Sequence, residues 1–429
     1  MKSSSKARVG GTEEKMIFDI REYGAVGDGK TLNTEKIQKA IDDCAAAGGG
    51  RVVIAGGKYM TGTVCLKQNV ELHLEADGIL FASPDCNDFP QNRPVNHVET
   101  KMLPRWSNSC LVYAEECENI SITGNGVIDC NGEAYIELSP DDNTGWLYQR
   151  KDSLTPSRVV FVTGCSNVKF EDFTMINQPA GWSIWIHDCD YVTADKLKII
   201  ADVNYPNNDG IHINSSRNVT VSNCCIRCGD DCIIVRANNV SLKENKVCER
   251  VTVTNCNLTS YSAGIRIGWV QDGIIRNCTF SNIVMTDCWC GIAFKIPYME
   301  YDPNNFRTAD VGREATLIEN MSFSNIICDR YHSVPVRMDV SDNPKLKFEA
   351  IRNVYFSGLH ARGIGYPYLC GREESPLKNI RFNDCTFEIT GEKETDPNFL
   401  RRRWEQPTVG MVTKHVDGLD FSNTTFTAK

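Results

Sequence analysis

The sequence has no stretch of about 18 apolar residues, so no membrane-spanning helix of ordinary length is predicted. Its first residues are basic and polar with no apolar segment after them, and no secretory signal is therefore predicted. Basic residues are in the minority: 46 Lys and Arg stand against 55 Asp and Glu, a net charge of −9. This balance argues against a general nucleic-acid or anionic-membrane binder. We expect a cytoplasmic protein, or a secreted one if a leader was trimmed, with no nucleic-acid or membrane partner.

A complete metal-binding pattern is also lacking, although the chain has 20 cysteines. Cys225-x-x-Cys228 and Cys228-x-x-x-Cys232 have spacings that zinc sites use, but no second pair and no nearby histidine pair completes a set of four ligands. Most cysteines recur at one phase of a repeat, which favours buried, reduced thiols that pack as small apolar groups. We expect no metal and no cofactor.

What the sequence does contain is an irregular repeat from Thr63 onward. Its unit is a run of short alternating strands ended by Asn, Gly or Asp, with examples beginning at Asn119, Asn167, Tyr191 and Asn218. The interval is 24 residues from Asn167 to Tyr191 and 27 from Tyr191 to Asn218. Such self-similarity is typical of a β-solenoid whose coils carry insertions. The sequence predicts an all-β fold, a parallel β-helix with a dry core.

Residues 17–60 are predicted to cap the first coil of this solenoid. Apolar residues at helical spacing predict a helix from Asn33 to Ala47, with Thr34 as its N-cap. A helix at this place would cover the open sheet edge that a solenoid otherwise exposes.

The whole of residues 17–429 is expected to form one domain after a tail, residues 1–16, that is disordered or was added to the chain. Long insertions would interrupt the coils at residues 87–106, 133–156, 299–316 and 391–407. We expect the first three to build a ligand cleft, because long loops on a rigid scaffold commonly carry binding sites. The last is expected to be a C-terminal loop insertion.

Three aspartates in the middle of the chain are the best candidates for chemistry. Asp209 lies in Asn208-Asp209-Gly210, and Asp230 and Asp231 lie 21 and 22 residues further on, close to one coil. One coil would therefore place Asp209 beside the pair. Clustered carboxylates suit glycosidic bond cleavage, because one gives a proton while another takes one from water. An inverting acid and base need about 6.5–9.5 Å between them, which a diagonal offset between coils about 4.8 Å apart would reach.

Further motifs occur in a fixed order along residues 17 to 390. They are Tyr23-Gly24-Ala25-Val26-Gly27-Asp28-Gly29, Gly124-Asn125-Gly126-Val127-Ile128-Asp129, Gln178-Pro179-x-x-Trp182, Asn208-Asp209-Gly210 and Gly229-Asp230-Asp231-Cys232. This ordered set resembles glycoside hydrolase family 28, the polygalacturonases and rhamnogalacturonan hydrolases. The resemblance implies a right-handed, single-stranded parallel β-helix and metal-free hydrolysis with inversion. It also implies that Asp230 is the general acid, while Asp209 and Asp231 hold and deprotonate the attacking water.

The sequence departs from the family pattern around these aspartates. His212 stands where the family usually has a further aspartate, and Ala263 stands where it has the histidine of Gly-His-Gly. The family's Arg-Ile-Lys is Ala293-Phe294-Lys295 here, so the lysine is present and the arginine is not. We interpret His212 and Arg266 as substitutes for the missing imidazole and guanidinium, and expect them and Lys295 to bind substrate. Three residues one coil before Asp209 are further candidate sugar contacts: Trp182, Trp185 and His187.

The favoured function is an inverting, exo-acting glycosidase for pectin-derived oligosaccharides, cleaving galacturonide or rhamnogalacturonide linkages with a modified subsite. A calcium-dependent polysaccharide lyase is one alternative, in which the three aspartates would bind calcium and Arg236 or Arg266 would be the base. A non-catalytic, carbohydrate-binding β-helix is the other. The expected partner is an oligosaccharide, and the expected state is a monomer or homodimer.

Overall fold

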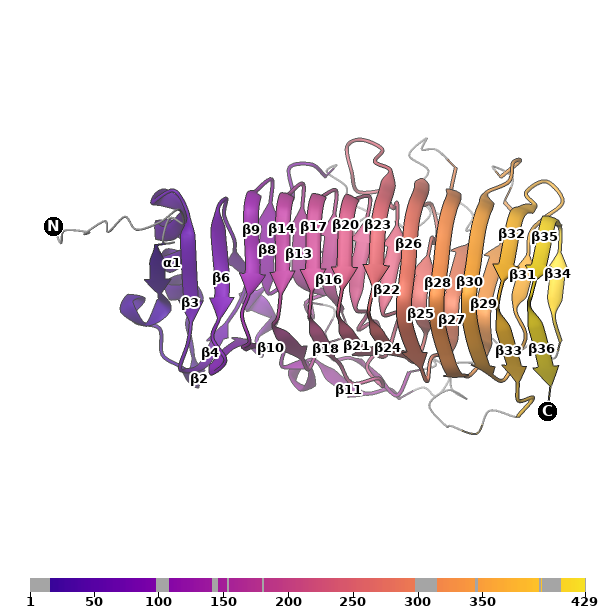
Figure 1. Cartoon of the computed structure of the whole chain (residues 1–429). Helices are drawn as coiled ribbons and strands as arrows, with labels where there is room; N and C mark the ends of the chain where they lie inside the picture. The colour runs from indigo at the N-terminus through magenta and orange to yellow at the C-terminus, as the bar shows by residue number, and fades with distance from the viewer. Residues whose placement is uncertain are drawn as a thin grey trace, which may run out of the picture.

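The protein is described here by a computed structural model, in which stacked coils run from an N-terminal helix at one end to the last strands at the other (Figure 1). The structure describes residues 16–97, 108–140, 146–152, 154–179, 181–297, 315–343, 346–392, 395 and 410–428. The predicted tail except for residue 16 lies outside this range, as do most of the predicted insertions at 299–316 and 391–407 and the end of the insertion at 87–106. The predicted all-β, parallel β-helix with an N-terminal helical cap is confirmed.

Sheet B, the smaller of two long sheets, has 11 strands, and its neighbouring strands pair in parallel. Its strands are β5 (Val64–Cys65), β8 (Val112–Glu115), β13 (Arg158–Thr163), β16 (Trp182–His187), β19 (Ile211–Asn214), β22 (Ile233–Arg236), β25 (Ala263–Ile267), β27 (Cys290–Ile296), β29 (Val334–Val340), β31 (Tyr368–Cys370) and β34 (Val412–Lys414). In β19 the isoleucines at 211 and 213 point into the core, so the side chains between them point outward.

Sheet A has 23 strands, and most coils contribute two of them. They are β1 (Ile17–Asp19), β2 (Asp28–Leu32), β3 (Gly50–Ile54), β4 (Gly57–Thr61), β6 (Val70–Leu74), β7 (Gly78–Ala82), β9 (Glu118–Thr123), β10 (Val127–Asp129), β14 (Ser166–Glu171), β15 (Thr174–Ile176), β17 (Asp190–Asp195), β18 (Lys198–Ile200), β20 (Arg217–Ser222), β21 (Cys225–Cys228), β23 (Cys248–Thr254), β24 (Asn257–Ser260), β26 (Ile274–Thr286), β28 (Leu317–Tyr331), β30 (Ile351–Gly363), β32 (Leu377–Asn383), β33 (Thr386–Ile389), β35 (Val416–Ser422) and β36 (Thr425–Ala428).

Short elements complete the described chain. A two-stranded antiparallel hairpin, β11 (Ile136–Leu138) and β12 (Tyr148–Arg150), lies within the insertion predicted at 133–156. Three 3-10 helices are η1 (Ile20–Tyr23), η2 (Cys86–Asp88) and η3 (Gly132–Ala134). Among the described residues, no helix combines the length and the apolarity that crossing a membrane requires.

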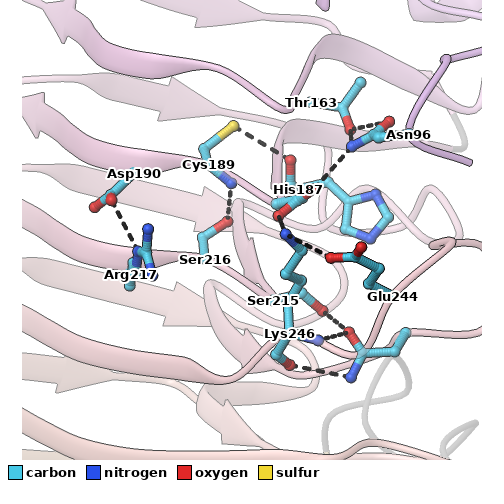
Figure 2. Close-up of polar contacts among 12 residues, drawn as sticks. Asn96, Thr163, His187, Cys189, Asp190, Ser215, Ser216, Arg217, Glu244 and Lys246 are labelled. Atoms are coloured by element: carbon cyan, nitrogen blue, oxygen red, sulfur yellow. Dashed lines mark hydrogen bonds and ion pairs between the residues drawn. The ribbon is translucent and has the colours of Figure 1, made fainter. Parts of the chain in front are cut away.

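Side chains bond from coil to coil at the corners between the sheets. Asn167 Nδ2 donates to Asn119 Oδ1 (2.6 Å), and Asn119 Nδ2 donates to Asn69 Oδ1 (2.8 Å). These asparagines have positive φ, a conformation that asparagine adopts more readily than most residues. At a later corner Arg217 Nε donates to Asp190 Oδ2 (2.8 Å), as Figure 2 shows. The ladders hold the coils in register, and the register places the outward side chains of sheet B.

The N-terminal cap is the helix α1 (Thr34–Ala46), which buries Ile37 and Ile41. The predicted N-cap, Thr34, is wrong: the N-cap is Asn33, and no side-chain hydrogen bond caps the helix. Asn33 instead exchanges hydrogen bonds with the backbone of Val26, and the Thr34 hydroxyl accepts one from the Gly62 N–H (2.8 Å). Both side chains tie the cap to the first coils.

The cysteines behave as the repeat pattern predicts, because all are free thiols. All are buried except Cys65, Cys86, Cys117 and Cys225. Only Cys225 is exposed, while Cys228 at the end of the same strand is buried, so the two do not form a zinc-binding pair.

Candidate active site

The register of sheet B brings the three aspartates together. Ile211 of β19 pairs with Ile233 of β22, so Asp209 and Asp231, each two residues earlier, lie side by side on adjacent coils. One carboxylate oxygen from each of Asp209, Asp230 and Asp231 lies within 4.8 Å of the other two. The predicted clustering is confirmed. The register pairs Asp209 with Asp231, so the predicted acid Asp230 is one residue out of register with Asp209. The oxygens of the three nevertheless lie closer than the 6.5–9.5 Å expected of an inverting pair.

The backbone around the cluster is tightly packed. Asn208 is buried, and its side-chain oxygen accepts a hydrogen bond from the Gly229 N–H (2.7 Å) across the coils. A Cβ on Gly229 would lie 2.5 Å from the carbonyl oxygen of Val203, and one on Gly210 would lie 2.2 Å from that of Cys232. Only glycine fits at either position, which explains why a glycine flanks each aspartate motif.

Asp209 is buried and contacts an imidazole. Its Oδ2 lies 2.9 Å from His212 Nε2, and its Oδ1 has no hydrogen-bond partner among the described residues. Burial raises the pKa of Asp209 well above its usual value, and the charges of Asp230 and Asp231 raise it further. Burial, followed by the cations Arg266, Arg158 and Arg236, lowers the pKa of His212 well below its usual value. The raised pKa of Asp209 and the lowered pKa of His212 together favour one proton shared between the two side chains.

Asp231 is engaged at both oxygens, one by an ion pair and the other by a hydrogen bond. Arg266 Nη1 lies 2.7 Å from Oδ2, and the backbone N–H of Ala263 donates to Oδ1 (2.9 Å). Burial by itself lowers the pKa of Arg266, but the neighbouring carboxylates outweigh this effect and leave the pKa raised. Ala263 thus contributes a backbone donor at the position where the family's histidine is absent.

Asp230 is the most accessible of the three aspartates, since it is half-buried while the other two are buried. The side-chain amide of Asn207 donates to its Oδ2 (3.3 Å). Its backbone carbonyl is held from below by the Ser260 hydroxyl (2.5 Å) and the Cys228 thiol (3.0 Å). Three neighbouring carboxylates therefore have three different surroundings, as separate roles in catalysis require.

Trp182 lies next to this cluster, between two other side chains. The His212 ring stacks on it at 3.6 Å between centroids with 12° between the planes, and the Arg158 guanidinium lies 3.5 Å from its ring centroid. Sequence reasoning missed Arg158. The available signal was its position, because it lies 24 residues before Trp182, at the same phase of the repeat.

Trp185 and His187 lie further from the aspartates and are covered. Trp185 is 7% exposed and stacks on Phe161 at 4.3 Å between centroids. His187 is fully buried, and its Nδ1 lies 3.0 Å from Nε2 of His97, which comes from the preceding insertion. Figure 2 shows His187 at the corner beside Thr163 and Cys189. Neither residue presents an exposed face to a sugar here, and their role as sugar contacts stays a prediction.

Lys295 lies on the other side of the cluster, with Trp269 beside it. The Arg266 guanidinium lies 4.8 Å from the ring centroid of Trp269, and the Lys295 ammonium lies 5.8 Å from it. Both distances suit cation–π contacts. Sequence reasoning missed Trp269, although it directly follows the segment that ends in Gly268.

The oxygen cluster has a spacing that a cation would accept, and the donor set tests this possibility. Arg266 already pairs with Asp231, and His212 already contacts Asp209. A calcium site would need these oxygens free of cationic partners. The residues present fit proton transfer better than metal binding.

Two family models match parts of the chain. The model described as "Glycosyl hydrolases family 28" matches residues 96–249, and the model described as "Rhamnogalacturonase A/epimerase, pectate lyase-like" matches residues 17–155. Over residues 96–249 the chain is therefore similar to glycosyl hydrolases family 28.

Curated relatives are similar over part of their length, and a solved structure shares the fold. A "Probable polygalacturonase" of Vitis vinifera is 26% identical over 282 residues, which cover 64% of this chain and 56% of that protein. An "Exo-poly-alpha-D-galacturonosidase" of Dickeya chrysanthemi is 30% identical over 254 residues, which cover 51% and 41%. The chain thus spans about half the length of these relatives. The crystal structure of a hyperthermoactive exopolygalacturonase from Thermotoga maritima shares the fold, with a TM-score of 0.73, 21% identity, and coverage of 96% and 93%.

Proposed function

We propose that this protein is an inverting glycoside hydrolase that removes galacturonate residues from the ends of pectin-derived oligosaccharides. The observation that carries the proposal is the cluster of Asp209, Asp230 and Asp231, whose oxygens lie within 4.8 Å of one another in three different surroundings. Relatives named as an exo-acting galacturonosidase and exopolygalacturonases support the substrate class and the exo action.

The surroundings assign the roles. Asp230 is the most accessible carboxyl and meets the leaving oxygen as general acid. Asp231, which contacts Arg266 and the Ala263 N–H, accepts a proton from water. Asp209 helps to hold the same water, and its contact with His212 gives the proton a second acceptor. Because the oxygens are close, the water lies against Asp209 and Asp231 on one side, and does not lie between acid and base.

Burial favours this single displacement over a covalent intermediate. A nucleophilic carboxylate must reach the anomeric carbon directly. Asp209 and Asp231 are only 2% and 1% exposed, and each is engaged by a neighbouring side chain. A water molecule can occupy the space between them and the sugar, so inversion is the expected outcome.

The cations beside the cluster suit an acidic sugar. Arg266 and Lys295 flank the ring of Trp269, which combines positive charge with an aromatic face. A galacturonate offers its carboxylate to the two cations and the apolar face of its ring to Trp269. This arrangement is the modified subsite of the proposal, because the family's histidine and first arginine are Ala263 and Ala293 here.

The lyase alternative lacks a suitable base among the two arginines considered. The pKa of Arg266 is raised by its carboxylate neighbours despite its burial, which opposes loss of its proton. Arg236 is held by Asp272, with Nη2 to Oδ1 at 2.6 Å and Nε to both carboxylate oxygens at 3.1 Å. Neither arrangement resembles a group prepared to abstract a proton from a sugar.

Product analysis from tetragalacturonide, with and without a chelator, tests the proposal. We expect monogalacturonate as the first product, no effect of EDTA, and no product with Asp230→Asn. The matched control, Asp420→Asn, changes an exposed aspartate on the last coil and should leave the rate unchanged. Unsaturated products that appear only with calcium would establish a lyase instead. Cleavage of rhamnogalacturonide alone would move the proposal to that linkage, and binding without cleavage of either would indicate a non-catalytic protein.

A further inference from the structure

A stack of three side chains ends at the aspartate cluster. The Arg158 guanidinium lies 3.5 Å from the Trp182 ring, that ring stacks on His212 at 3.6 Å, and His212 Nε2 lies 2.9 Å from Asp209 Oδ2. We infer that Arg158 and Trp182 are positioning residues, which orient the His212 imidazole toward Asp209 and keep it neutral. The inference rests on the proposed function only for its effect on the reaction rate.

The register explains the order of the stack. Arg158 of β13 pairs with Trp182 of β16, and His212 belongs to β19, the next strand of sheet B. The Trp182 ring therefore separates a guanidinium on one coil from an imidazole two coils later. Both faces of the ring are covered, so only its edge can meet a sugar. Its main contact with the site is His212.

Arg158 is an unusual residue to bury at this position. It is 7% exposed, its Nη1 donates to the Ser157 carbonyl (2.6 Å), and its Nε has no hydrogen-bond partner. Among the described residues it forms no ion pair with a carboxylate. Burial lowers the pKa of Arg158 to about 9, so the guanidinium is still cationic at neutral pH. Burial of a cation without an ion pair is unfavourable, whereas an apolar side chain would fill the same space without that desolvation.

The positive charge of Arg158 affects the protonation of the His212 imidazole. The groups that face His212 are the cations Arg158, Arg266 and Arg236 and the carboxyl of Asp209. Each cation opposes a second proton on the ring. A neutral ring can accept a hydrogen bond from the Asp209 carboxyl and hold that carboxyl in place, whereas an imidazolium cannot. The His212 ring must also be oriented correctly. Parallel stacking on Trp182 holds the plane of this ring so that Nε2 points to Asp209.

The test uses variants that separate charge from packing. Arg158→Met keeps the length and the packing against Trp182 but removes the charge, and Arg158→Lys keeps the charge. Trp182→Phe keeps an aromatic surface. If Arg158→Met does not fold, as judged by its circular dichroism spectrum, Arg158→Gln replaces it as a smaller, neutral, planar side chain.

Two readouts are measured on the full chain. The first is the titration of ring-15N-labelled histidine by NMR, with the His212 signal assigned by its loss in His212→Gln. Its midpoint should move to higher pH in Arg158→Met and stay at the wild-type value in Arg158→Lys. The second is the rate on galacturonides: kcat should fall about tenfold in Arg158→Met with KM within about twofold, because proton transfer is impaired and binding is not.

The two readouts distinguish the failure of this inference from failure of the proposed function. An unchanged His212 midpoint in Arg158→Met would overturn the inference, whatever the activity. A shifted midpoint in a protein that cleaves no galacturonide would uphold the positioning role and refute the proposed function. A shifted midpoint with an unchanged kcat would refute the link between the stack and the reaction.

Discussion

Replacing Arg266 by methionine is the perturbation whose effect the structure specifies in most detail. Arg266 Nη1 lies 2.7 Å from Asp231 Oδ2, and the side chains of Arg266 and Asp231 are 13% and 2% exposed. Methionine has a similar length and fills much of the same space. The substitution therefore removes the positive charge and leaves the carboxylate of Asp231 buried beside Asp209 and Asp230.

The expected loss is about 3 kcal/mol of the free energy of unfolding at pH 7. Breaking a buried ion pair by removing one partner typically costs about 3–5 kcal/mol, because a buried charge is left uncompensated. We take the lower end because Arg266 keeps some contact with solvent. The double variant Arg266→Met/Asp231→Asn should regain about 2 kcal/mol of that loss, since no uncompensated charge remains, yet both variants should be inactive.

Urea denaturation followed by near-UV circular dichroism measures these differences, provided that the m values of the variants agree. A local readout is the hydrogen exchange of the Ala263 amide, which donates to Asp231 Oδ1 and should exchange faster in Arg266→Met if the pairing is disturbed. The reasoning is refuted if Arg266→Met loses less than about 1 kcal/mol, or if the double variant is no more stable than Arg266→Met.

Three further predictions concern other parts of the protein. The folded pKa of Asp209 lies above the unfolded value of about 3.9, so the wild type loses stability as pH rises from there toward the folded pKa. Asp209→Asn should therefore be inactive but more stable by about 0.5–2 kcal/mol at pH 7. Urea denaturation should show this gain shrinking toward pH ~4. Absence of the gain would contradict a raised pKa of Asp209. Trp269→Ala should raise KM about three- to tenfold with kcat within about twofold, since it removes a contact with the sugar worth about 1 kcal/mol. Steady-state kinetics measure both constants, and a fall in kcat alone would place Trp269 outside the sugar site. Ellman's reagent should react quickly with one thiol of the folded protein, that of Cys225, and with all 20 after unfolding; several fast thiols, or a fast thiol that persists in Cys225→Ser, would contradict the described packing.

The repeat made the fold and the carboxylate cluster predictable from the sequence. In a solenoid, residues one period apart lie side by side whatever the identity of the loops between them. The interval from Asp209 to Asp231 therefore predicted a contact between residues of adjacent coils, and the structure places their oxygens within 4.8 Å of each other. Buried thiols followed from the same periodicity, because one phase of the repeat faces the core.

Features set by single contacts between distant segments were not predictable in this way. Trp185 was expected to face a sugar, but it is buried, and His97, from an insertion with no repeat, packs beside it. The partners of Arg158 depend on the rotamers of side chains on neighbouring coils, which periodicity does not specify. Likewise the cap residue of α1 was misplaced, because Thr34 is used in a contact with Gly62 that the local sequence does not reveal.

The most direct test of the account is proton NMR of the first turnover products. The protein is mixed with an α-linked galacturonide, and the newly formed reducing end is recorded before mutarotation equilibrates the anomers. The account predicts that the β-anomer forms first, and that neither anomer forms with Asp230→Asn. The α-anomer as first product would contradict it, because a carboxylate would then act as nucleophile and the water-holding roles of Asp209 and Asp231 would be wrong.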